Sequence, residues 1–191
     1  MGDPESSGDA AGPNDDAPGS TVDARGGVGE PADLSGMTLY HNQVRAMVDT
    51  SGIAGGPLPA LDWDSALAAT AASWVAQCQD SDRDGLVDHN VNRSVGHPWY
   101  VGENIFAGSG PVTAHDAVFL PVFGWAAEQA HFHYAANSCD AGATCGHYTQ
   151  LVWRATQKVG CALGSCPGLR YPNTIVCDYG PGGNVGDQKP Y

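Results

Sequence analysis

The chain has 191 residues and a formal net charge of −13 at pH 7. Its length is enough for one domain with a sizeable core. Nucleic-acid binding requires a basic surface, and 8 Lys and Arg against 21 Asp and Glu argue against it. No apolar run approaches the ~20 residues of a transmembrane helix, so we predict no membrane span.

The first 35 residues are mainly Gly, Asp, Pro, Ala and Ser, with eight acids and one Arg. Such a segment cannot bury enough apolar surface to offset its chain entropy. We therefore predict a disordered acidic tether at 1–35 and a folded domain at 36–191. The start of the chain lacks the basic and then apolar pattern of a signal peptide, so we expect any leader to be absent from this sequence.

Two amphipathic helices are predicted near the start of the folded domain. Over 39–49, apolar residues recur at i, i+4, i+7 and i+8. In the second segment, Asp64 is a suitable N-cap, and an apolar stripe runs from Leu67 to Cys78.

A run of alternating acids follows the second helix. Residues 80–88 read D-x-D-x-D-G-x-x-D, the first nine positions of an EF-hand-like loop. Position twelve is Val91 rather than a bidentate Glu, which predicts weak calcium affinity. The alternative is a polar connection without an ion. The predicted calcium ligands are Asp80, Asp82, Asp84, the Leu86 carbonyl and Asp88, the last either directly or through water.

The second half of the chain mixes loops, one helix and several strands. Gly102 to Ile105 resembles a short turn, and residues 111–121 are predicted as a loop that leads to a third helix over 124–134. The stretch from Cys145 to Ala162 is rich in β-branched and aromatic residues, which predicts a strand. Read with period two, it places His147, Thr149, Leu151 and Trp153 on one side. Two further strands are expected at 159–163 and 174–179.

Six cysteines lie between Cys78 and Cys177. An even number inside the folded part predicts three disulfides and an oxidising compartment. The alternatives are buried free thiols or a zinc knuckle, and the lack of any C-x-x-C pair argues against the zinc site.

Two histidines and two glutamates are candidates for zinc binding or acid–base chemistry: His89, Glu103, Glu128 and His147. Their long spacing does not by itself bring them together. Taken singly, His147 could be a core histidine and Glu128 a helix-surface acid.

About 150 residues of the chain resemble the CAP superfamily, which includes cysteine-rich secretory proteins, antigen five and the plant pathogenesis-related class-one proteins. The stretch from Gly146 to Trp153, GHYTQLVW, is the most specific part. The other matching pieces are His41-Asn42 with Arg45, Leu61, Trp63-Asp64, Leu67-Ala68, Ala71, Gly102-Glu103-Asn104-Ile105, Trp125 with Glu128 and Tyr134, Gly160-Cys161-Ala162, Val176-Cys177-Asp178-Tyr179 and Gly183-Asn184.

The resemblance implies an α+β fold, a disulfide-stabilised three-layer α-β-α sandwich with a central antiparallel sheet. It implies a cavity in which His89, Glu103, Glu128 and His147 hold Zn²⁺ or another divalent ion. The acidic loop before His89 is an insertion that departs from the family's pattern. The implied disulfides are Cys78–Cys166, Cys139–Cys145 and Cys161–Cys177, and the C-terminal segment is similar to one released as a peptide from plant relatives.

The resemblance favours a secreted, monomeric, non-catalytic domain that binds a sterol, a fatty acid or a protein partner. One alternative is a zinc-dependent hydrolase that uses His89 and His147 as ligands and Glu103 or Glu128 as base. The lack of an H-E-x-x-H helix or a nucleophile elbow argues against it. A defence or virulence effector that acts through surface loops is the other alternative.

Overall fold

The computed structural model describes residues 29–191, so most of the predicted tether lies outside the described residues. The described chain begins inside that predicted segment. A short 3-10 helix, η1 (Ala32–Leu34), buries Leu34 completely. The Glu30 carboxylate accepts hydrogen bonds from the backbone N–H groups of Gly36 and Thr38. The packed part of the chain therefore starts before residue 36.

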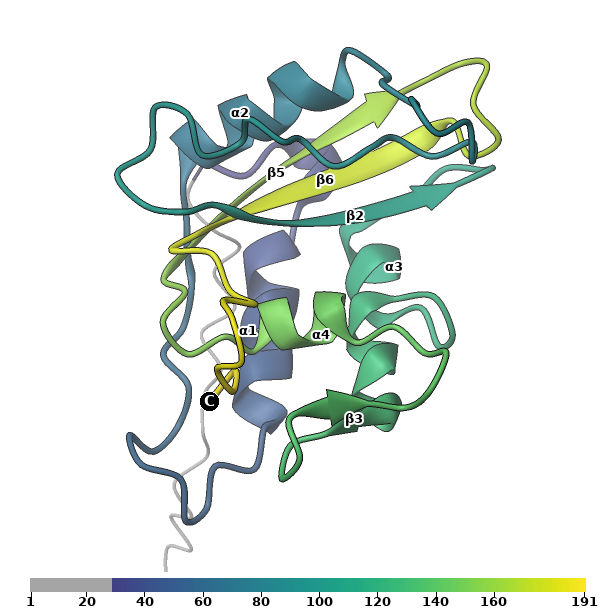
Figure 1. Ribbon diagram of the computed structural model, residues 1–191. Coiled ribbons are helices and arrows are strands. Elements are labelled where there is room, and N and C mark those ends of the chain that lie inside the picture. The colour runs from purple at the N-terminus through teal and green to yellow at the C-terminus, as the bar shows by residue number, and fades with distance from the viewer. Residues whose placement is uncertain (1–28) are drawn as a thin grey trace, which may run out of the picture.

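Helices lie on both faces of one sheet, which gives the three layers that the resemblance implies (Figure 1). The sheet order is β1 (Asp62–Trp63), β5 (Lys158–Ser165), β6 (Asn173–Gly180), β2 (Gly102–Gly108). The pairs β5–β6 and β6–β2 are antiparallel, and the two-residue β1 joins β5 in parallel. β2 therefore forms one edge of this sheet.

One face of the sheet is covered by a single helix, α2 (Ser65–Val75). The Asp64 carboxylate caps it by accepting hydrogen bonds from the N–H groups of Ala66 and Leu67, as the sequence predicts. A Cβ at Gly160 of β5 would lie 2.3 Å from backbone atoms of the first turn of α2. The missing side chain is what lets helix and strand backbones approach this closely.

The other face is covered by α1 (Met37–Met47), α3 (Ala114–Phe119), η2 (Trp125–His131) and α4 (Gly146–Leu151). Here lies the main core, where Ile175, Cys177 and Tyr179 of β6 are buried. Arg45 of α1 is also buried, and its guanidinium donates to the carbonyls of Leu151 and Trp153, among others. Burial lowers the pKa of Arg45 to about 10. These bonds join α1 to the end of α4.

A small hairpin completes the fold at the end of the molecule away from α2 (Figure 1). It pairs β3 (Phe132–His133) with β4 (Ser138–Cys139). Three disulfides are formed, Cys78–Cys166, Cys139–Cys145 and Cys161–Cys177, the pairs that the resemblance implies. Cys161 and Cys177 are direct partners in the β5–β6 register.

Several predicted elements differ from the structure. The strand prediction for the stretch that begins at Cys145 is wrong over 146–151, which forms α4. Tyr148, Leu151 and Val152 are all buried, so the apolar residues follow i, i+3, i+4 rather than alternation. The turn predicted at Gly102 is the start of β2, the loop predicted over 111–121 contains α3, and the third helix is the shorter 3-10 helix η2.

Candidate functional site

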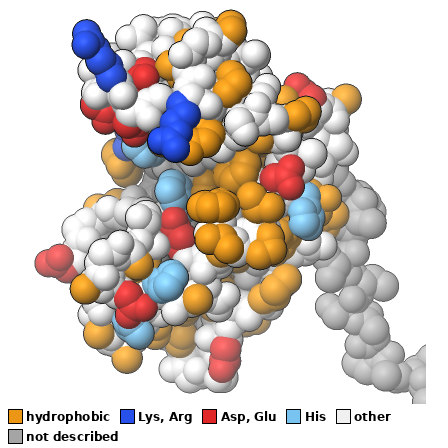
Figure 2. Space-filling model, turned by 90° about the vertical axis from the view of Figure 1, so that its right-hand side faces the viewer, with side chains coloured by type: hydrophobic (Ala, Val, Ile, Leu, Met, Phe, Trp, Pro, Cys, Tyr) orange, Lys and Arg blue, Asp and Glu red, His pale blue; other side chains and the backbone are white. Residues whose placement is uncertain are grey.

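A groove of about 890 Å³ runs beside the edge strand β2. The acidic loop at 82–88 lies on one side and α3 with the following segment on the other. The face that contains the ends of these elements is hollowed, and histidine, acidic and hydrophobic side chains meet there (Figure 2). Both His89 and His147 line the groove. Its apolar lining includes Leu86, Val87, Ile105, Val112, Leu120 and Phe123.

His147 is held at the start of α4 by Glu128 of η2. Its Nδ1 lies 2.6 Å from Glu128 Oε1. The second carboxylate oxygen, Oε2, accepts hydrogen bonds from the backbone N–H groups of His147 and Tyr148 at 2.9 and 3.0 Å. These N–H groups belong to the first turn of α4, and the N–H groups of a first turn have no carbonyl acceptor within their own helix. Glu128 therefore fixes both the helix end and the imidazole.

His89 is held by Glu103 of β2. Its Nδ1 lies 2.6 Å from Glu103 Oε1, which also accepts from the backbone N–H of Asn90 at 2.9 Å. The imidazole is 57% exposed, whereas the Glu103 side chain is fully buried. In the described part of the chain, Glu103 Oε2 is buried without a conventional hydrogen-bond donor.

Asp178 of β6 is the direct partner of Glu103 in the sheet register. Burial, followed by the charge of Glu103, raises the pKa of Asp178 to about 8. Its carboxyl group is therefore protonated at neutral pH, and a hydrogen bond to Glu103 contributes to the raised pKa. Glu103 Oε2 and both Asp178 oxygens have no other partner among the described residues, so a proton shared by the two carboxyl groups would supply the missing donor.

The two pairs share one chemical pattern. A carboxylate only accepts hydrogen bonds, so in each pair the imidazole Nδ1 carries a proton, and in the neutral form of the ring Nε2 is the nitrogen with the lone pair. Metal-binding histidines commonly use a carboxylate in this way to fix the ring and its tautomer. Each pairing gives its glutamate, Glu103 or Glu128, the task of orienting a ring. Among the described residues, however, the four do not bring ligand atoms of three residues within 4.8 Å of one another.

Sequence reasoning missed residues that support these pairs. Asn104 donates from Nδ2 to the His147 carbonyl and to the Tyr179 hydroxyl. The same hydroxyl bonds to Nε2 of buried His41, whose Nδ1 faces the Met37 carbonyl. Burial lowers the pKa of His41 to about 4, so this ring is neutral. Asn104 lies in the quoted GENI piece, but its spacing carries no signal that it reaches α4.

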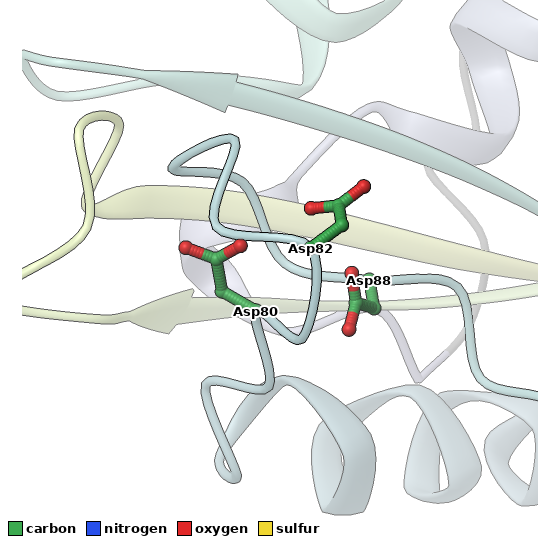
Figure 3. A group of neighbouring side chains, drawn as sticks. All are labelled: Asp80, Asp82 and Asp88. Carbon is green, nitrogen blue, oxygen red and sulfur yellow. The ribbon is translucent and has the colours of Figure 1, made fainter.

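The acidic loop brings some of its predicted ligands together (Figure 3). One carboxylate oxygen each from Asp80, Asp82 and Asp88 lie within 4.8 Å of one another. Asp84 instead accepts a hydrogen bond from the backbone N–H of Leu86 and is not part of this group. Gly85 makes the turn with a φ of 89°. Among the described residues, Asp80 Oδ1 is buried without a donor.

Comparison with known proteins gives the family. Residues 39–179 match the model of the cysteine-rich secretory protein family, CAP. The chain belongs to this family. It is 38% identical over 152 residues to pathogenesis-related protein 1 of Arabidopsis thaliana, covering 79% of this chain and 78% of that protein. It is 35% identical over 158 residues to GLIPR1-like protein 1 of Bos taurus, covering 79% of this chain and 59% of the bovine protein.

The fold is similar to that of a solved CAP-type structure. Venom allergen-like protein 4 of Schistosoma mansoni superposes with a TM-score of 0.62 at 25% identity, covering 81% of this chain and 90% of that one. Three disulfides fit an extracellular protein, in agreement with the secretory name of the family. Over residues 29–191, the helices are too short or too polar to cross a membrane.

Proposed function

We propose that this chain is a secreted, non-catalytic binding protein whose groove takes a small apolar ligand, a sterol or a fatty acid, beside a divalent metal ion. The supporting observation is that two oriented imidazoles and a set of apolar side chains line the same groove. Its volume of about 890 Å³ lies within the range of small-molecule sites.

The metal would be held by Nε2 of His89 and Nε2 of His147, with Glu103 and Glu128 behind them. Bound there, the ion would supply a positive charge at one end of the groove. The matched test is zinc titration of the wild-type chain and of His89→Ala with His147→Ala. We expect the double variant to lose one binding site, and unchanged stoichiometry and affinity would reject the metal proposal.

The ligand proposal is tested on two neighbouring exposed side chains. Phe123 lines the groove, whereas Val122 does not, and both are about three-quarters exposed. A charge in the lining opposes apolar contact. Phe123→Asp should therefore weaken binding of a fluorescent fatty acid or sterol, and Val122→Asp should not. Equal effects, or no binding by the wild type, would leave a protein partner as the occupant.

A zinc-dependent hydrolase is the second candidate. A general base needs a free lone pair directed at a water molecule. The hydrogen-bonded positions of Glu103 and Glu128 disfavour either residue in that role. Turnover of peptide or ester substrates by the zinc-loaded wild type, lost in Glu128→Gln, would favour the hydrolase over the binding protein.

We also propose that the loop at 80–88 binds calcium. The convergence of Asp80, Asp82 and Asp88 and the unpartnered oxygen of Asp80 support this. With no Glu at position twelve, we expect an affinity of about 10⁻⁴–10⁻³ M, as in extracellular modules. Calcium at millimolar concentration should raise the melting temperature of the wild type but not that of Asp80→Asn with Asp82→Asn. If calcium leaves the melting temperature of the wild type unchanged, the loop is an acidic connection that binds no calcium.

A further inference from the structure

His131 and His133 lie outside the groove, on the small hairpin. His131 ends η2 and His133 belongs to β3, so the two residues are separated by one position. Asp140 follows β4, and its backbone N–H donates to the His131 carbonyl at 3.0 Å. His131 directly precedes β3 and Asp140 directly follows β4, so this backbone bond continues the pairing of the hairpin by one step and places Asp140 beside His131.

Both imidazoles contact the carboxylate of Asp140, although the three residues do not yet bring one ligand atom each within 4.8 Å of one another. Nδ1 of His131 lies 3.2 Å from Asp140 Oδ2, and Nε2 of His133 lies 2.6 Å from Asp140 Oδ1. The side chains are 52%, 57% and 48% exposed for His131, His133 and Asp140. Two imidazole nitrogens thus face one carboxylate at the surface, where an ion can reach them from solvent.

We propose that His131, His133 and Asp140 form a surface site for a transition-metal ion of the Zn²⁺ type. Two imidazoles and one carboxylate are a ligand set that zinc accepts, and exposure leaves room for water as a fourth ligand. The half-exposed side chains need to rotate to close on one ion. Each ring keeps one proton, which moves to the nitrogen that does not bind the metal.

The backbone under this site is restrained. The Cys139–Cys145 bridge ties the residue before Asp140 to the residue before α4. The hairpin register pairs Phe132 with Cys139 and His133 with Ser138. Only side chains therefore have to be ordered when the ion binds, which lowers the entropic cost of binding.

The site is tested by zinc titration in a chain that lacks the groove histidines. In the His89→Ala, His147→Ala background, we expect about one zinc per chain to remain bound. Adding His131→Ala and His133→Ala should remove it, and Asp140→Asn alone should weaken it by about tenfold or more. The matched control is His97→Ala, because His97 is a partly exposed histidine that contacts Thr70 and, within residues 29–191, forms no ion pair with a carboxylate.

Several results would overturn the proposal. Zinc binding that survives His131→Ala with His133→Ala would place the ion elsewhere. No zinc binding by the background chain at millimolar concentration would show that the three residues only cross-link the hairpin. If the background chain does not fold, the wild type is titrated against His131→Ala with His133→Ala, and a loss of one site is then the expected result. Circular dichroism of each variant reports folding separately from metal binding.

Discussion

The two histidine–glutamate pairs of the groove have the same 2.6 Å contact but different supports. His147 sits in a helix whose first turn donates to Glu128, and its ring is 29% exposed. His89 sits in an irregular segment directly after the acidic loop, and its ring is 57% exposed. One imidazole is thus fixed by regular structure, whereas the other depends on a loop and on a buried acid pair.

The largest expected difference between these two regions concerns their disulfides. Cys78–Cys166 anchors the chain just before the acidic loop, at a sequence separation of 88, and Cys139–Cys145 precedes α4 at a separation of 6. Loop-closure entropy predicts losses of about 4–5 and about 2 kcal/mol when each pair is changed to Ser. Urea unfolding measures both, and equal losses would contradict the entropic account.

The next test compares Glu128→Gln with Glu103→Gln. Glutamine has one acceptor oxygen, whereas Glu128 uses two. If the glutamine oxygen accepts from the His147 ring, its NH₂ group faces the backbone N–H groups of α4, which are then left unpaired. At 103, the oxygen can still accept from His89 while the amide donates to Asp178. We expect losses in the free energy of unfolding of roughly 3 kcal/mol and under about 1 kcal/mol, respectively. A larger loss at 103 would reverse the comparison.

The acid pair behind His89 predicts a pH effect. The pKa of Asp178 is about 8 in the folded state against 3.8 unfolded, so the folded chain holds a proton that the unfolded chain has released. Stability therefore falls as pH rises through this interval. Between pH 6.5 and 8, above the titration of His41, we expect a loss of about 2 kcal/mol in the metal-free wild type and a flat profile in Asp178→Asn. A flat wild-type profile would contradict the shared proton.

The smallest expected effect is that of calcium. At a few millimolar, binding with the proposed affinity adds about 1 kcal/mol. Hydrogen exchange should slow at the amides of 85–89 and remain unchanged at 146–149. Slower exchange at both places, or at neither, would contradict the expectation that calcium orders only the segment that leads to His89. Asp88→Asn is the control that should abolish the response.

Sequence patterns with a strong local cause were predicted well. The Asp64 cap with its apolar stripe gave α2, and the β-branched segments around Cys161 and Cys177 gave β5 and β6. The strand prediction at His147 is wrong because six residues are too few to separate the two periods, and aromatic and β-branched content favoured a strand. What makes this segment helical is partly non-local, since Glu128 supplies the acceptor for its first turn.

The resemblance named two histidines that line the groove and the two glutamates that hold them, but not how the four residues act. The division into two His–Glu pairs is seen only in the side-chain contacts of the folded chain. The place of Asp178 beside Glu103 follows from the register of β2 and β6. The sequence around Glu103 and around Asp178 does not indicate that one of these two acids is protonated. The same limit applies to Asn104, whose hydrogen bonds span 43 and 75 positions along the chain. Such contacts depend on tertiary packing rather than on local pattern.

The close approach of α2 to the sheet has a mechanical consequence. Gly160 and Gly164 of β5 have no side chains, and Val75 Cγ2 of α2 lies 2.4 Å from where a Cβ of Gly164 would stand. Helix and strand are therefore packed too closely for α2 to shift or rotate on the sheet. Trp74 of α2 donates to the Asp88 carbonyl at 2.7 Å, which pins the far end of the acidic loop to the same immobile helix. Any displacement in the loop must therefore be taken up between Asp80 and Asp88. Because α2 holds Asp88 in place, it also fixes the position of the next residue, His89.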